Sequence, residues 1–255
     1  MVKKRLIFTL LYHNGNFMLS RNFRLQRVGD TNWLNKNYNF SSIATSIDEL
    51  IILDVSRGEI DTAAFCKHIE EVTRGCFMPL ALGGGITHAE QVIKLMSSGA
   101  DKIVLNSILV RNPGVVRELI SRYGSQCIIA SVDYRLEKEE FVVYIDRGRE
   151  KLNMSLTEYV KYLVELEVGE IYLNSIDQDG TGQGYCLDVI NQLSQITHIP
   201  VIMAGGAGNY HHLLEGIQHP GVDAVATANL FNFIGNGLPS SRQYLLDAGV
   251  DLAQW

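Results

Sequence analysis

Short runs of apolar residues recur along the chain, and most are followed by a stretch in which apolar positions return every three or four residues. The runs are typical of strands buried on both faces, and the periodic stretches are typical of helices that cover such strands. Their alternation predicts parallel strands joined by helices. The expected strands are 5–11, 49–54, 79–83, 102–106, 127–133, 170–175, 200–204 and 223–228. The expected helices are 32–45, 60–74, 87–98, 112–122, 155–167, 186–197, 209–217 and 240–247.

Three of the expected helices begin with recognisable capping sequences. THAE (87–90) and SLTE (155–158) have the spacing of capping boxes, and Asn112 precedes a proline suited to the first helical position. A different pattern follows the fifth strand, where polar and apolar residues alternate over 135–150. We expect a β-hairpin in that segment.

The chain also repeats itself: four apolar runs of its first half recur in its second half, in the same order and at nearly one offset. The runs are LIFTLL (6–11), ELIIL (49–53), PLALGGG (79–85) and GADKIVLNS (99–107), and their counterparts are IIASVD (128–133), EIYLN (170–174), PVIMAGG (200–206) and GVDAVATAN (221–229). The repeat predicts an α/β fold, a (β/α)8 TIM barrel built from two duplicated (β/α)4 halves near 1–123 and 124–255. Because no linker separates the halves, we expect 1–255 to form a single domain.

The composition narrows the class of partner. The 255 residues are 46% hydrophobic, which supports a large core, and the net charge of −6 argues against nucleic acid as a partner. The first apolar stretch is too short to cross a membrane or to act as a secretory signal, so we expect a cytoplasmic protein without membrane contact. The cysteines lack metal-site spacing, so we expect buried free thiols, no metal and no cofactor.

Glycines follow the third and seventh strands, at Gly83-Gly84-Gly85 and at Gly205-Gly206. In a barrel of this kind the chemistry gathers where the strands end, and such loops can present backbone N–H groups to an anion. Asn106-Ser107 and Ala228-Asn229 follow the neighbouring strands. The twin loops therefore predict two phosphate sites at opposite sides of the barrel mouth. The alternative is that tight barrel turns need glycine for steric reasons alone.

Several of these segments resemble the cyclase (HisF-like) subunits of imidazole glycerol phosphate synthase, (β/α)8 barrels of histidine biosynthesis. The resemblance rests on GSQCIIASVD (124–133), SIDQDGTGQGY (175–185) and the glycine-containing segments quoted above, and it covers nearly the whole chain. It implies phosphate-binding roles for the loop residues at both sites. These candidates are Gly84, Gly85, Asn106 and Ser107 at the first site, and Asp179, Gly180, Gly205, Gly206, Ala228 and Asn229 at the second.

The resemblance does not extend to all of the residues that would carry out the reaction. The family uses two aspartates, one at the end of the first strand and one at the end of the fifth, as general acid and base. Asp133 matches the second, but Leu11 stands at the first, in TLLYHNG (9–15) where the family has CLDVKDG. A leucine cannot exchange a proton, and Leu19, Asn174 and Ala204 also depart from the family pattern. We interpret this as altered or lost cyclisation, although Asp133 could also be a local cap.

The opposite end of the barrel keeps a charged set. Arg5, Glu49, Lys102 and Glu170 open the first, second, fourth and sixth strands. Solvated strand entrances would explain such charges without a function, but alternating signs could also close into a ring. The resemblance implies a salt-bridged ammonia gate at these four positions, and it implies that Asp101 faces a partner glutaminase.

Three hypotheses follow. The leading one is a synthase-type subunit that forms a heterodimer with a HisH-like glutaminase and channels ammonia to a phosphorylated small molecule or a downstream amidotransferase, in the manner of paralogues linked to surface-polysaccharide (lipopolysaccharide) sugars. The second is a working cyclase in which His13 or Asp54 replaces the lost acid. The third is a non-catalytic activator of the glutaminase.

Overall fold

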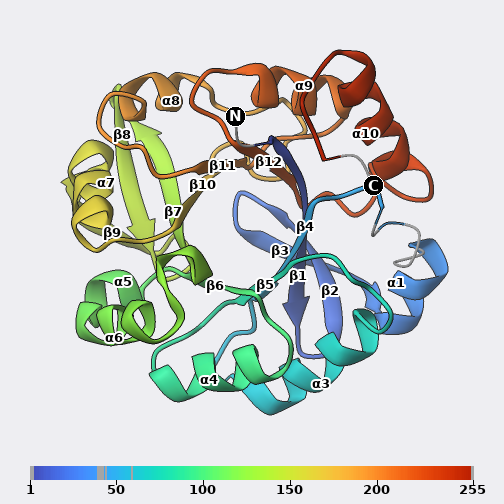
Figure 1. The fold of residues 1–255 in the computed structure, drawn as a ribbon, viewed down its shortest axis with the longest axis horizontal. Coiled ribbons are helices and arrows are strands. Elements are labelled where there is room, and N and C mark those ends of the chain that lie inside the picture. Colours follow the sequence, from blue (N-terminus) through green and yellow to red (C-terminus); the bar gives the residue numbers. More distant parts are fainter. Residues whose placement is uncertain (1–2, 39–42, 44, 59, 254–255) are drawn as a thin grey trace.

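Eight parallel strands close into a barrel around which the helices are arranged (Figure 1). The computed structural model describes residues 3–38, 43, 45–58 and 60–253. The barrel strands are β1 (Arg5–His13), β4 (Glu49–Asp54), β5 (Leu80–Gly83), β6 (Lys102–Leu105), β7 (Ile128–Glu137), β10 (Glu170–Ser175), β11 (Val201–Ala204) and β12 (Ala224–Thr227). Each pairs with its neighbours in this order, and β12 pairs with β1 to close the ring. The predicted (β/α)8 fold is confirmed.

Helices connect successive barrel strands and cover the outside of the barrel (Figure 1). They are α1 (Thr31–Asn37), α3 (Thr62–Val72), α4 (Ala89–Ser97), α5 (Ile108–Arg111), α6 (Pro113–Tyr123), α7 (Leu156–Glu165), α8 (Asp188–Leu193), α9 (Tyr210–Gln218) and α10 (Gly237–Asp247), with a 3₁₀ turn over Ser125–Cys127. The expected helix 32–45 is shorter, since α1 ends at Asn37, and its positions 39–42 and 44 lie outside the described residues. The expected helix 186–197 is also shorter.

Two of the three capping predictions are confirmed. Ser155 and Glu158 form the capping box of α7, and the side chain of Asn112 caps α6. The box predicted at 87–90 is wrong. Helix α4 begins one residue later, and the Oε1 atom of Gln91, not a glutamate, accepts the N–H group of His88 at 3.1 Å. A glutamine can complete this cap as well as a glutamate, so the sequence pattern did not fix the register.

Two antiparallel extensions rise from β1 and β7, the strands that correspond in the internal repeat. The first, β2 (Asn16–Arg21) with β3 (Arg24–Asp30), was not predicted. The sequence feature that indicates it is Asn14-Gly15. These two residues form the turn between β1 and β2, and both have positive φ (46° and 80°), as a two-residue hairpin requires. The second is β8 (Glu140–Ile145) with β9 (Glu150–Ser155), so the hairpin expected at 135–150 is present and continues further.

The last helix is bound to the first half of the barrel by a buried ion pair. The guanidinium of Arg242 on α10 donates to both oxygens of Asp48, at 2.9 and 3.0 Å. The Asp48 carboxylate also accepts the N–H group of Leu6 at 2.7 Å. Both charged side chains are buried, so each satisfies the other where water cannot.

Side chains on alternate positions of the barrel strands point inward and form layers. The lowest layer holds the charged strand entrances, and the layer above it is apolar. The apolar cluster consists of Ile7, Ile51, Ala81, Val104, Ile129, Tyr172, Ile202, Ala204, Ala224 and Ala226, with Leu53 packed against it. Three alanines of this set, Ala204 on β11 and Ala224 and Ala226 on β12, give that side of the interior small side chains.

Candidate active site and barrel floor

A cavity of about 890 Å³ opens at the carboxyl ends of the barrel strands. Its wall includes Asp133, Leu11 and all ten predicted phosphate-binding residues. The structure therefore brings together, in one cavity, candidates that lie up to 145 positions apart in the chain (84 to 229). A cavity of this size suits a small organic ligand.

Glycine is required in both loops because the neighbouring backbone leaves no room for a Cβ atom. Gly84 has a φ of +101°, and a Cβ atom there would lie 2.1 Å from the carbonyl oxygen of Asp54. Gly206 has a φ of +110°, and its Cβ atom would lie 1.9 Å from the carbonyl oxygen of Gly184. The steric explanation therefore holds for these positions. It does not exclude an anion, because the N–H groups of Gly85 and Gly206 donate to no acceptor within the described part of the chain.

Asp133 is buried at the end of the β7 barrel segment and is held by two amide side chains. Asn174 donates to its Oδ1 atom and Asn106 to its Oδ2 atom, both at 3.2 Å. Burial raises the pKa of Asp133 to about 7, because desolvation penalises the carboxylate more than the two amides stabilise it. A carboxyl group with this pKa can accept or release a proton near neutral pH.

Leu11 also lines the cavity, so no acid comes from the end of the first strand. Of the two proposed substitutes, Asp54 lines the cavity and His13 is absent from its wall. The Oδ1 atom of Asp54 accepts the N–H group of Ser56 at 2.9 Å. Burial raises the pKa of Asp54. A second buried carboxyl group is therefore available, on the strand next to β1.

Asp179 and Gly180 hold the tip of the first hairpin. The Oδ2 atom of Asp179 accepts the hydroxyl group of Ser20 at 2.5 Å and the N–H group of Phe23 at 3.0 Å. A Cβ atom at Gly180 would lie 2.0 Å from the carbonyl oxygen of Ser20. Both residues line the cavity, but the Oδ2 atom of Asp179 is already bound to the hairpin. Sequence reasoning missed this contact because it missed the hairpin.

A polar contact crosses the barrel interior, between two residues that also line the cavity. The hydroxyl groups of Thr9 on β1 and Tyr172 on β10 lie 3.2 Å apart, and both side chains are buried. Burial raises the pKa of Tyr172, so its hydroxyl stays protonated. Sequence reasoning missed this pair as well, although a tyrosine at an inward position of EIYLN (170–174) was a signal.

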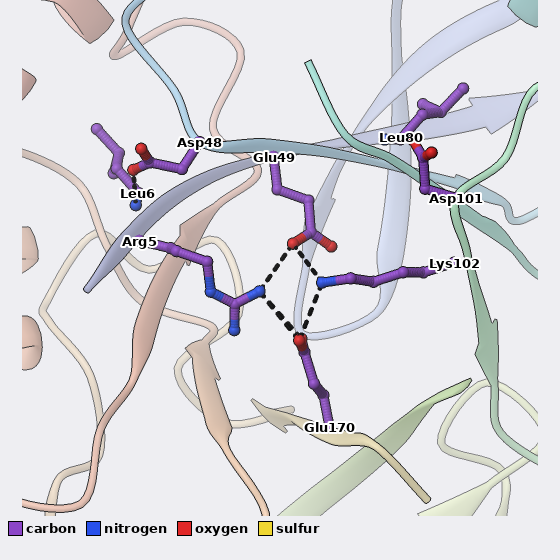
Figure 2. A network of polar contacts seen from close by, with 8 residues as sticks. All are labelled: Arg5, Leu6, Asp48, Glu49, Leu80, Asp101, Lys102 and Glu170. Carbon is purple, nitrogen blue, oxygen red and sulfur yellow. Dashed lines mark hydrogen bonds and ion pairs between the residues drawn. The ribbon is translucent and has the colours of Figure 1, made fainter. Parts of the chain in front are cut away.

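The four charged strand entrances meet at the floor of the barrel (Figure 2). One nitrogen of Arg5 contacts the Oε2 atom of Glu49 at 2.8 Å and the Oε1 atom of Glu170 at 3.1 Å. The Nζ atom of Lys102 contacts the same two oxygens at 2.8 and 2.9 Å. The result is a closed ring of alternating charge across the barrel axis, in which no charge is left alone.

The ring leaves one acceptor unused. The Oε1 atom of Glu49 is buried and has no hydrogen-bond partner among the residues that the structure describes. Burial raises the pKa of Glu49, against the lowering effect of Lys102 and Arg5. The two carboxylates raise the pKa of Arg5 although burial acts in the opposite direction. The floor is thus closed by four paired charges, and one carboxylate oxygen, Oε1 of Glu49, remains free to accept a hydrogen bond from a small donor.

Comparison with known proteins shows the family of this chain. Residues 28–235 match the sequence model of the family described as histidine biosynthesis protein. The chain belongs to this family. It is 44% identical over 256 residues to a protein of Parasynechococcus marenigrum provisionally named imidazole glycerol phosphate synthase subunit hisF2, in an alignment covering 100% of this chain and 95% of that one. It is 35% identical to the imidazole glycerol phosphate synthase subunits HisF of Staphylococcus carnosus and Bacillus cereus, with 99% of each chain covered.

In this HisF-like chain Asp101 lies beside the charged ring and has a contact of its own (Figure 2). Its Oδ2 atom accepts the N–H group of Leu80 at 2.8 Å. Asp48 and Asp223 make the equivalent contact with Leu6 and Val201. Asp101 is exposed, and its carboxylate caps the first residue of β5.

Other expectations concern the rest of the HisF-like chain. The four cysteines are free thiols, of which Cys66 is buried and the other three are half-buried, so the predicted full burial is correct only for Cys66. Within the described ranges, no group of three or more histidine, cysteine, aspartate or glutamate side chains is arranged to hold a metal ion. None of the helices in the described part of the chain combines the length and apolarity of a membrane span.

Proposed function

We propose that this HisF-like chain is the synthase-type subunit of a cytoplasmic glutamine amidotransferase. A HisH-like glutaminase would dock at the barrel floor, near Asp101, and ammonia would pass the ring and the barrel interior to an acceptor in the cavity. The acceptor would carry phosphate groups bound by the two glycine loops. One observation carries the proposal: the floor ring is complete, with each charge paired, in a barrel whose cavity has Leu11 where a catalytic acid is expected.

The ring suits ammonia as cargo. The buried Oε1 atom of Glu49 would accept an N–H donor without disturbing the four ion pairs. Movement of one flexible side chain, such as that of Lys102, would open the ring while the other three charges remain paired. The apolar layer above the ring would keep the nitrogen unprotonated, because a charged species is disfavoured there.

The acceptor is proposed to differ from, or to be additional to, the intermediate of histidine biosynthesis. Ring closure with ammonia needs protons moved at two places on the substrate, and Leu11 removes one of the two groups. By analogy with paralogues of the family, we propose as the acceptor a sugar derivative of a surface-polysaccharide pathway, such as lipopolysaccharide synthesis. In this scheme Asp133, with a pKa of about 7, is the group that accepts the proton during amination.

A reconstituted complex tests the proposal. The chain would be mixed with a HisH-type glutaminase, and glutamine hydrolysis, ammonia in solution and product from the phosphorylated precursor of imidazole glycerol phosphate would be measured. A conduit predicts complex formation, and it predicts that Lys102→Ala leaks ammonia while stimulation of the glutaminase persists. Lys67→Ala, at an exposed position on α3, is the matched control. Loss of stimulation alone would instead identify an activator, and no complex would refute the proposal.

A second candidate function is authentic cyclisation. It is favoured by Asp54, a buried carboxyl group in the wall of the cavity. In this case the chain would convert the histidine-pathway precursor with free ammonia, and Asp54→Asn would abolish the reaction. Absence of product above the uncatalysed background would exclude it.

A further inference from the structure

The two hairpin tips meet at the cavity. A Cβ atom at Gly148, in the turn between β8 and β9, would lie 2.9 Å from the Cδ2 atom of Phe23, in the turn between β2 and β3. Phe23 and Arg147 both line the cavity. The tips therefore pack against one another at the mouth, and side chains carried by them line the cavity.

The second tip is also fixed to the loops around the first glycine site. The N–H group of Asp146 donates to the Oγ atom of Ser107 at 3.0 Å, and the guanidinium of Arg147 donates to the carbonyl oxygen of Ser56 at 2.5 Å. Arg111, on the short helix after Ser107, pairs with Glu150 at 2.5 Å. These contacts bring the loop after β4, the loop after β6 and the turn between β8 and β9 together.

Four arginines converge where these segments meet: Arg57, Arg111, Arg147 and Arg149, all of which line the cavity. We call them the arginine cluster. Two carboxylates accompany them, since Asp146 lies 3.8 Å from Arg147 and Glu150 pairs with Arg111. Arg57 and Arg149 have no hydrogen bond or ion pair from their side chains to any described residue.

This excess of positive charge is local, because the chain as a whole carries a net charge of −6. Unpaired guanidinium groups of like charge, gathered at one cavity wall, repel one another until an anion separates them. The other tip has Arg21 and Arg24 in the cavity wall, and the Asp179 carboxylate is bound to the backbone of Phe23, which lies between them in the chain. The larger group of arginines lies on the side of Gly84, Gly85 and Ser107.

We propose that the arginine cluster binds a second phosphoryl group next to the one held by the Gly84–Ser107 loops, so that the ligand of this cavity ends in a diphosphate on that side. Guanidinium forks match phosphoryl oxygens in pairs, and a diphosphate supplies adjacent oxygens to both the free N–H groups of the loop and the arginines. The inference rests on the proposed function only for the phosphate in the glycine loop.

Direct binding of two simple anions tests this subsite. Inorganic phosphate and pyrophosphate would be titrated into the purified full chain by calorimetry, without a partner protein. Pyrophosphate is expected to bind at least about tenfold more tightly than phosphate, since each charge-assisted hydrogen bond gained is worth that factor or more. The double variant Arg57→Gln/Arg149→Gln is expected to weaken pyrophosphate about tenfold while phosphate affinity changes less than about twofold.

Matched controls remove the same charge elsewhere. Arg27→Gln lies on β3 and Arg117→Gln on α6, both exposed and outside the cavity wall, and their double variant should bind both anions as the parent does. Gly85→Ala, whose Cβ atom would lie 1.7 Å from Ile60, should weaken both anions. Thermal unfolding would verify that each variant is folded.

Three results would overturn the subsite. Equal affinity for the two anions would show that no second phosphoryl group is recognised. An equal loss in the cluster variant and in the control would show general electrostatic attraction. Binding of neither anion would also remove the phosphate sites, whereas the glutaminase assay decides the ammonia route by itself. The two proposals can therefore fail separately.

Discussion

The hydroxyl groups of Thr9 and Tyr172 lie 3.2 Å apart and join β1 to β10 across the interior of the barrel. β11 and β12 separate these two strands on the shorter way around the ring, so the tyrosine side chain reaches across the interior rather than to a neighbour. It lies above the charged floor and also lines the cavity. Any molecule that travels along the axis must pass this pair.

The first prediction concerns the energy of this contact. Thr9→Val and Tyr172→Phe should each lower the free energy of unfolding by about 1 kcal/mol, because each leaves the other hydroxyl buried and unpaired. The double variant should lose less than the sum of the two. Urea denaturation of the four proteins gives the coupling energy, which should lie between about 0.5 and 1.5 kcal/mol. A coupling energy near zero would show that the two hydroxyl groups do not interact.

The second prediction restores the missing acid. Leu11→Asp places a carboxyl group in the cavity wall, at the position where the sequence resemblance implies the first of two catalytic aspartates. Turnover of the histidine-pathway precursor with free ammonia should rise by at least about 10²-fold, the usual contribution of one general acid or base. Leu11→Asn is the control, since it matches the aspartate in shape but cannot exchange a proton. A similar rise in both variants would contradict a role in proton transfer.

The third prediction concerns pH. Burial raises the pKa of Asp133 from 3.8 to about 7, so the folded chain binds this proton more tightly than the unfolded chain does. Its contribution to stability is fully present below about pH 4 and is lost as the pH rises through about 7.

Asp133→Asn removes that pH dependence. Relative to the parent chain, the variant should gain on the order of 2 kcal/mol in free energy of unfolding between pH 5 and pH 8. Denaturant titrations at the two pH values measure the difference. If the difference between variant and parent were the same at both values, the pKa of Asp133 would not be raised. Amination that depends on Asp133 as a base should likewise increase as the pH rises through about 7.

The fourth prediction concerns the contact between Asp179 and the tip of the first hairpin. Ser20→Ala removes one of the two donors to the Asp179 carboxylate. The amide groups of residues 20–24 should then exchange with deuterium at least about tenfold faster, because a hydrogen bond to a charged group is worth about 1.5–3 kcal/mol. Ser97→Ala, which removes a hydroxyl bond to the carbonyl oxygen of Ile93 on α4, is the control. Unchanged exchange at the hairpin would contradict the prediction.

The barrel could be predicted from the sequence because its strands are short, apolar and repeated, as IIASVD and PVIMAGG illustrate. Positions at strand ends could be predicted for the same reason: Arg5 and Lys102 open strands, and Asp133 stands where β7 leaves the barrel, since its pairing with β10 ends at Tyr134. The features that could not be predicted are contacts between side chains that are distant in the sequence and close in the fold. The Ser20 and Asp179 contact joins positions 159 residues apart, and only the fold reveals it.

The first extension was missed because its strands contain few apolar residues. Segment 24–30 is mostly polar and exposed, so it has no hydrophobic alternation to detect. The Asn14-Gly15 turn is the sequence feature that indicates the extension. The arginine cluster was missed for a related reason. Arg57 lies in the loop after β4, Arg111 on α5 and Arg149 in the turn between β8 and β9, and no spacing in the sequence relates them.

The ion pair between Asp48 and Arg242 has a consequence for how the chain is made. Asp48 is synthesised 194 residues before the arginine that neutralises it, so a growing chain on the ribosome holds this carboxylate without its partner until almost the last residue has been added. The early strands can pair, but their charged edge stays hydrated until α10 docks. A chain that stops short of α10 would therefore keep the strands that close the barrel but leave the Asp48 carboxylate without its cation.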